Sequence, residues 1–117
     1  MLPGLRGLPA SEYDGGARMF GLDGPYHAVV AVLGKGFLAS EPGYPDDNYK
    51  TDVCWYVEDI KTGARLTVWN YKNGPNYSGR PLQLVDHFSV YYQDGREVPG
   101  SGVMLWERVQ RAVERED

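Results

Sequence analysis

With 117 residues, of which 42% are apolar and 24% charged, the chain has the length and composition of a single globular domain. Its net charge of −4 makes duplex nucleic acid an unfavourable partner, because such binding relies on a basic excess that displaces counterions. Cys54 is the only cysteine, so we expect neither an intramolecular disulfide nor a cysteine-based zinc site, which fits a reducing cytoplasm.

The first part of the chain predicts an arm, a short helix and one strand. Residues 1–9 carry two prolines and two glycines and are interpreted as an extended arm, ordered only where something docks it, while residues 10–117 form the single domain. A short helix is predicted from Ser11, its N-cap, to about Phe20. The run His27–Leu33 is rich in β-branched residues and is followed by glycines, so it predicts the first strand.

Two segments in the middle of the chain predict a β-hairpin. Residues 52–59 place Val53, Trp55 and Val57 on one face and more polar residues on the other. Residues 60–63 form the turn, where Gly63 can adopt the positive φ of a short connection. The chain then returns as a strand over residues 65–71.

The C-terminal part predicts one more strand and a helix. Residues 88–92 alternate as a strand does, and residues 82–85 form either a turn or a short strand. A helix begins after the N-cap Ser101 and continues to about Glu114. Its apolar stripe is expected to pack on the sheet, whereas an exposed stripe would mark a partner groove or a homodimer face; the stripe consists of Val103, Trp106, Val109 and Val113.

These elements together predict an α+β fold. Its antiparallel sheet has about four strands, and the N-terminal short helix and the C-terminal helix pack on one face of it. Charge is distributed unevenly along this fold, with six acids and one base in residues 41–59 and four bases and no acid in residues 61–80. The two blocks are either two solvated faces or a patch that steers an anion.

The stretch from Thr67 to Arg80 concentrates potential ligand contacts. The spacing of Gly74 and Gly79 matches part of a phosphate loop, but Arg80-Pro81 follows where a Walker loop needs lysine and serine or threonine. Backbone amides at the glycines could still hold an anion, and a tyrosine could stack a base. The other interpretation is ordinary turn chemistry. The candidate ligand-binding residues are Asn70, Lys72, Asn73, Asn76, Tyr77 and Arg80.

No pattern predicts catalysis, a metal, a cofactor or a membrane segment. The acids between Asp46 and Asp52 lack the spacing of a calcium loop, and His27 and His87 lack metal-ligand spacing. A nucleophile–base pair of Cys54 and His87 on neighbouring strands is conceivable. No run approaches the ~20 apolar residues of a membrane span, and residues 1–9 do not form a signal peptide. We therefore expect a protein that is not an enzyme.

Three segments of the chain resemble a family of viral proteins. They are Met19–Gly21, Lys50–Asp59 and Thr67–Gly79, and they are similar to segments of small accessory proteins of unknown function encoded by tailed bacteriophages, especially those of actinobacteria. The resemblance covers about residues 18–89 and weakens after Arg80, where a tryptophan-centred strand would be expected. No catalytic residue can be assigned to this chain from the resemblance.

The resemblance implies a bacteriophage accessory protein in the cytoplasm of a bacterial host. Such a protein would be a non-enzymatic binder that inhibits or modulates a host or defence protein. The alternative, drawn from the residues themselves, is a binder of a nucleotide or another anionic small molecule through residues 70–80.

Overall fold

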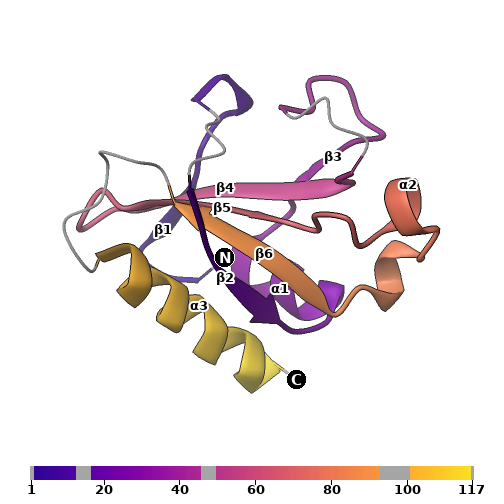
Figure 1. Cartoon of the computed structure of the whole chain (residues 1–117). Coiled ribbons are helices and arrows are strands. Elements are labelled where there is room, and N and C mark those ends of the chain that lie inside the picture. The colour runs from indigo at the N-terminus through magenta and orange to yellow at the C-terminus, as the bar shows by residue number, and fades with distance from the viewer. Residues whose placement is uncertain (1, 13–16, 46–49, 93–100, 117) are drawn as a thin grey trace.

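The computed structural model describes residues 2–12, 17–45, 50–92 and 101–116. Within these ranges the chain forms a six-stranded antiparallel sheet in the order β1-β4-β5-β6-β2, with β3 also paired to β4 (Figure 1). The α+β class is thus confirmed, and the sheet is larger than the sequence predicted. The strands are β1 (Leu5–Gly7), β2 (Ala17–Asp23), β3 (Phe37–Leu38), β4 (Val53–Asp59), β5 (Arg65–Trp69) and β6 (His87–Tyr92).

The helical elements are three α-helices and two 3-10 turns in the described residues. They are α1 (Tyr26–Leu33), α2 (Pro75–Ser78), α3 (Ser101–Glu116), η1 (Ala10–Glu12) and η2 (Leu82–Leu84). The helices α1 and α3 lie on the same side of the sheet, while α2 lies beyond the ends of the strands β4 and β5 (Figure 1). The C-terminal helix is confirmed, and η2 occupies the segment for which a turn or a short strand was expected.

The predicted hairpin forms the centre of the sheet as β4 and β5. Cys54 pairs with Trp69 at one end of the hairpin and Glu58 with Arg65 at the other. Gly63 adopts a φ of 78° in the turn, as its position required. The strand β6 then pairs with β5 on the opposite side from β4.

The hydrophobic core lies between the sheet and the two long helices. Trp55 of β4 contacts Phe88 of β6 edge to face, with ring centroids 5.6 Å apart. Of the predicted stripe of α3, Val109 and Val113 are buried in this core and Trp106 packs partly against it, so these positions do not offer a dimer face. The side chain of Val103 lies outside the described part. The buried residues among the described side chains are Ala28, Val29, Val32 and Leu33 of α1 and Leu105, Val109, Ala112 and Val113 of α3.

The strand predicted at His27–Leu33 was wrong, because this run forms α1. A uniformly apolar run fits a buried strand and a buried helix equally well, so its periodicity does not distinguish them. The exposed residues His27 and Ala31 are four positions apart, which is the spacing of a helix. Packing of the opposite face against α3 and the sheet therefore decides the conformation.

The short helix predicted from Ser11 to Phe20 was also wrong. The segment begins with η1 and later joins β2, while residues 13–16 lie outside the described part. The strand β2 pairs with the free edge of β6, a partner about 70 residues further along the chain. Hydrogen bonds to that edge outweigh a helical preference weakened by two glycines.

The N-terminal segment, interpreted as an arm, is docked on the sheet through β1. Leu5–Gly7 pairs with β4, and the Leu2 N–H donates to the Val32 carbonyl of α1 at 2.6 Å. Arg108 of α3 donates to the Pro3 carbonyl and forms an ion pair with Asp59 at 3.3 Å. No helix in the described ranges is long and apolar enough to cross a bilayer.

Phe88 provides a test of the core. Phe88→Ala removes a fully buried ring from the contact with Trp55, so we expect a loss of about 3–5 kcal/mol in the free energy of unfolding. Ile60→Ala is the control, because Ile60 is 62% exposed and its truncation should change stability by less than about 0.5 kcal/mol. Urea denaturation followed by circular dichroism measures both, and similar losses in the two variants would contradict this core.

Candidate functional site

The side-chain amide of Asn70 organises the loop that follows β5. Asn70 Oδ1 accepts the N–H groups of Asp52 and Val53 at 2.8 and 3.1 Å. Its Nδ2 donates to the Asp52 carboxylate and to the Asn73 carbonyl, both at 3.1 Å. All hydrogen-bonding positions of this fully buried amide are thereby filled. Asn70 supports the loop and has no atom left for a ligand.

The loop from Tyr71 to Gly74 forms hydrogen bonds with two other parts of the chain. The Lys72 N–H donates to the Lys50 carbonyl at 2.8 Å, and Lys72 adopts a φ of 57°, a left-handed conformation that is uncommon for a residue with a side chain. Asn73 Nδ2 donates to the His87 carbonyl at 3.0 Å. The loop therefore has one well-defined path between β5 and α2.

Asp52 holds the start of α2 against this loop. Its carboxylate accepts the Asn76 N–H, with the shorter contact at 3.2 Å, and the side chain of Asn76 reaches the Thr51 carbonyl at 3.4 Å. A Cβ atom at Gly74 would overlap the Asn70 amide nitrogen and the Asp52 carboxylate. Gly74 is thus required by close packing, and its extended φ of 174° plays no part in that requirement.

The six candidate residues lie in one region but do not converge on an anion. The amides of Asn70 and Asn73 are used within the fold, and Lys72 Nζ lies 5.5 and 5.7 Å from the ring centroids of Tyr71 and Tyr77. Arg80 is exposed and has no hydrogen bond or ion pair with the described residues. The site assignment remains a prediction, and this geometry supports a structural role for its asparagines.

A groove with a volume of about 520 Å³ lies beside α2 and was not anticipated from the sequence. We call it the Asp52 groove, because Asp52 is the one charged residue among the described residues that line it. Its walls come from the start of α1, the end of β3 with the turn after it, the residue before β4, α2 and η2. They are formed by Tyr26, Leu38, Ala39, Ser40, Asp52, Pro75, Asn76, Leu82 and Gln83. No local sequence signal could find it, because its walls come from five separate segments.

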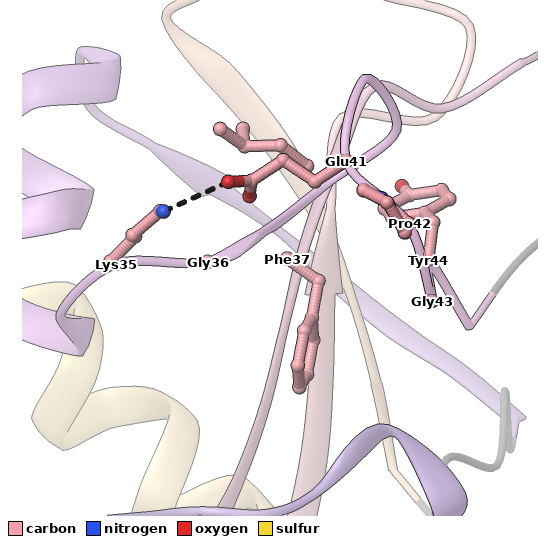
Figure 2. A pocket seen from close by; sticks show the side chains of 8 residues that line it. Lys35, Gly36, Phe37, Glu41, Pro42, Gly43 and Tyr44 are labelled. Atoms are coloured by element: carbon pink, nitrogen blue, oxygen red, sulfur yellow. Dashed lines mark hydrogen bonds and ion pairs between the residues drawn. The ribbon is translucent and has the colours of Figure 1, made fainter.

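A smaller pocket of about 230 Å³ lies next to this groove and shares Leu38 with it. Figure 2 shows it from close by, with Phe37 and the turn of Glu41, Pro42 and Gly43. Lys35 Nζ and Glu41 Oε2 form an ion pair at 3.1 Å, drawn as the dashed line. This pair neutralises both charges, so the small pocket adds no net charge to the region.

The elements α2 and η2, which line the Asp52 groove, each also carry an exposed apolar side chain. Tyr77 of α2 is 45% exposed, and Leu84 of η2 is 64% exposed. We call residues 75–84, which carry both side chains, the α2 surface. Ile60 is the other large hydrophobic residue that is exposed in the described ranges, and it lies in the turn between β4 and β5.

The sheet face opposite the helices carries a row of aromatic rings. Trp69 contacts Tyr71 and Tyr91, with centroids 6.0 and 5.0 Å apart. Cys54 is fully buried on this face, and β5 separates its strand from that of His87, so the two do not lie on neighbouring strands. His87 Nδ1 instead lies 2.7 Å from Asp23 Oδ1 at the exposed end of β6.

An ion cluster lies at the far end of the same face, with Glu58 and Arg65 largely buried and Arg6 and Glu12 exposed. The Glu58 carboxylate accepts hydrogen bonds from the guanidinium groups of Arg6 and Arg65 at 2.7 and 2.8 Å. The Arg65 guanidinium also lies 3.7 Å from the carboxylate of Glu12 in η1. Burial raises the pKa of Glu58, but hydrogen bonds from Arg65 and Arg6 outweigh it and lower the pKa below its ordinary value. This cluster joins β1 and η1 to the hairpin.

Among the described residues, no group of three or more histidine, cysteine, aspartate or glutamate side chains could hold a metal ion. His27 is exposed on α1, far along the chain from His87. Asp46, Asp47 and Asn48, the other members of the acidic segment, lie outside the described residues.

Asn70→Ala tests the support of the loop. The Asp52 and Val53 N–H groups would lose their acceptor, so we expect a loss of about 2–4 kcal/mol in the free energy of unfolding. Asn76→Ala is the matched control, because its exposed side chain makes one long hydrogen bond and should cost less than about 1 kcal/mol. Equal losses in urea denaturation would show that Asn70 has no special role.

Glu58→Gln tests the ion cluster through its pH dependence. Because the pKa of Glu58 is lowered by folding, its ionised form stabilises the protein above the unfolded pKa of about 4.3, and this contribution is lost as the pH falls through the lower folded pKa. The stability gap between wild type and Glu58→Gln should therefore be widest at neutral pH and narrow below about pH 4. The exposed Glu107→Gln should show no such gap, and a gap independent of pH would contradict the assignment.

Comparisons with protein-family models, with curated proteins and with solved structures found no match for this chain. We therefore infer the function from the geometry around the Asp52 groove and the α2 surface.

Proposed function

We propose that the protein is a non-enzymatic binding protein that contacts a partner protein through the α2 surface and the Asp52 groove. The observation that carries this proposal is that α2 and η2, which line the groove, each also carry an exposed apolar side chain, Tyr77 and Leu84. Exposed apolar groups on elements that border a groove are typical of interaction sites, whereas isolated ones such as Ile60 are ordinary.

The rigidity of the segment favours binding. The Asn70 amide donates to the Asp52 carboxylate, which also accepts the Asn76 N–H, and the Lys50 carbonyl accepts the Lys72 N–H. These hydrogen bonds fix the path of the loop before any partner arrives. A surface that is already ordered loses little conformational entropy on association. A tyrosine on such a surface supplies a large, amphipathic contact with few rotatable bonds, as binding hot spots often do.

The partner class follows from the resemblance to bacteriophage accessory proteins. We propose a host or defence protein in the bacterial cytoplasm, which the protein would inhibit or modulate by occupying one of its surfaces. This part of the proposal rests on the similarity of residues 50–59 and 67–79 to that family. The structure supports only the existence of a suitable surface.

The alternative ligand, a nucleotide or another anion, is less well supported. The charged group in the Asp52 groove is a carboxylate, which would repel a phosphate. The bases of the 70–80 loop do not offset this, because Lys72 lies against two tyrosine rings and Arg80 does not line the groove. A protein partner makes better use of the apolar side chains.

The double variant Tyr77→Ala/Leu84→Ala tests the proposed surface. Tagged wild-type protein, incubated with lysate of an actinobacterial host, should retain a stoichiometric protein identified by mass spectrometry. The double variant should bind that protein at least about tenfold more weakly, because two apolar anchors are removed. Titration of the purified partner by calorimetry gives the affinities.

Ile60→Ala is the matched control for this experiment. It removes a side chain of similar exposure at the other end of the hairpin, so it should bind the partner as wild type does. Equal binding by the double variant and the wild type would exclude the α2 surface. A rise in melting temperature with a panel of nucleotides, abolished by Lys72→Ala or Arg80→Ala, would support the anion-binding alternative instead.

A further inference from the structure

We infer that the Asp52 groove receives an arginine or lysine side chain from an extended segment of the partner protein. This inference rests on the proposed function and names the chemistry that the groove selects. It follows from the charge of the groove, the shape of its walls and its position beside the α2 surface.

The charge of the groove favours a cation. The Asp52 carboxylate accepts hydrogen bonds from the Asn76 N–H and the Asn70 amide, which are both neutral donors. No lysine, arginine or histidine nitrogen in the described ranges lies within ion-pair distance of it. A carboxylate with neutral partners, in a hollow partly shielded from water, attracts a cation more strongly than an exposed one does.

The walls suit a long side chain that has an apolar stem and a charged end. Leu38, Pro75 and Leu82 provide apolar surface for the methylene groups of lysine or arginine. Tyr26, which also lines the groove, offers a ring against which a guanidinium or ammonium group can lie. A bare metal ion fits less well, because it needs several oxygen ligands and Asp52 is the one carboxylate in the described lining.

The position of the groove favours a protein segment over a free amine. The groove is bounded by α2 and η2, which carry the exposed Tyr77 and Leu84. A small amine would leave both side chains unused, whereas a peptide could cover them and insert one basic residue. Ser40 and Gln83 in the lining can hydrogen-bond to its backbone.

Three blocked pentapeptides with the sequence Gly-Leu-X-Leu-Gly test this inference, where X is arginine, citrulline or glutamate. Citrulline has nearly the shape of arginine without its charge. Each peptide is titrated into the ¹⁵N-labelled full chain and followed by two-dimensional NMR. The arginine peptide should shift the amide resonances of Asp52 and Asn76, while the citrulline and glutamate peptides should bind at least about fivefold more weakly. Equal shifts with arginine and citrulline, or shifts confined to other residues, would overturn the inference.

A second test of this inference changes the charge at the rim of the groove. Asp52→Asn would disturb the support of α2, so the test uses Gln83, which lines the groove and is exposed. Gln83→Lys should weaken the arginine peptide by roughly threefold to tenfold, and Gln83→Glu should strengthen it. Ile60→Lys adds the same charge at the opposite end of β4 and should have no comparable effect. Equal effects of the two lysine substitutions would contradict a cation site here.

The same variants separate this inference from the proposed function. One outcome is that binding of the captured partner is weakened by the Tyr77 and Leu84 substitutions but is unchanged by Gln83→Lys and by excess arginine peptide. This outcome would support the proposed binding surface and would exclude insertion of a basic side chain into the Asp52 groove. If the partner tolerates the Tyr77 and Leu84 substitutions as well, both proposals fail.

Discussion

The side-chain amide of Asn70 is the interaction on which the binding face of this protein depends. It connects the start of β4, the end of β5 and the loop before α2 through four hydrogen bonds, and it is completely buried. A buried amide is costly to leave unsatisfied, so these bonds form together. Once they form, Asp52 is oriented toward α2, and Gly74 must be a glycine because no side chain fits beside the pair.

The hairpin that carries this amide is stabilised from both sides. One face of β4 packs against the core of α1 and α3, and residues 53–57 are buried throughout. The N-terminal segment pairs with the edge of β4 through β1, and on the other face the ion pairs of Arg65 with Glu58 and Glu12 join η1 to the sheet. A strand that is buried on both faces has little freedom to shift its register. The Asp52 groove at its N-terminal end is therefore built on a fixed support.

The polar residues of the 70–80 loop can be interpreted either as a ligand site or as structural support for α2. Asparagines, glycines and bases in one loop suggest contacts with an anion, but here the asparagine side chains bind the protein's own backbone. The polar groups of the loop thus form the hydrogen bonds that hold α2 in place. What it presents to the outside is the combination of Tyr77, Leu84 and a carboxylate-bearing groove, which suits an apolar segment of a partner with one basic side chain.

The sequence by itself determined the elements whose signals are local. Alternation in residues 53–59, the turn with Gly63 and the helical spacing after Ser101 gave the hairpin and α3 correctly, because neighbouring residues specify them. Tertiary structure decided the rest. The run His27–Leu33 became a helix because α3 and the sheet bury one of its faces, and β2 formed because the edge of β6 needed a hydrogen-bonding partner from far along the chain. The Asp52 groove likewise exists only where five separate segments meet, because a groove is a property of packing that no single stretch of sequence encodes.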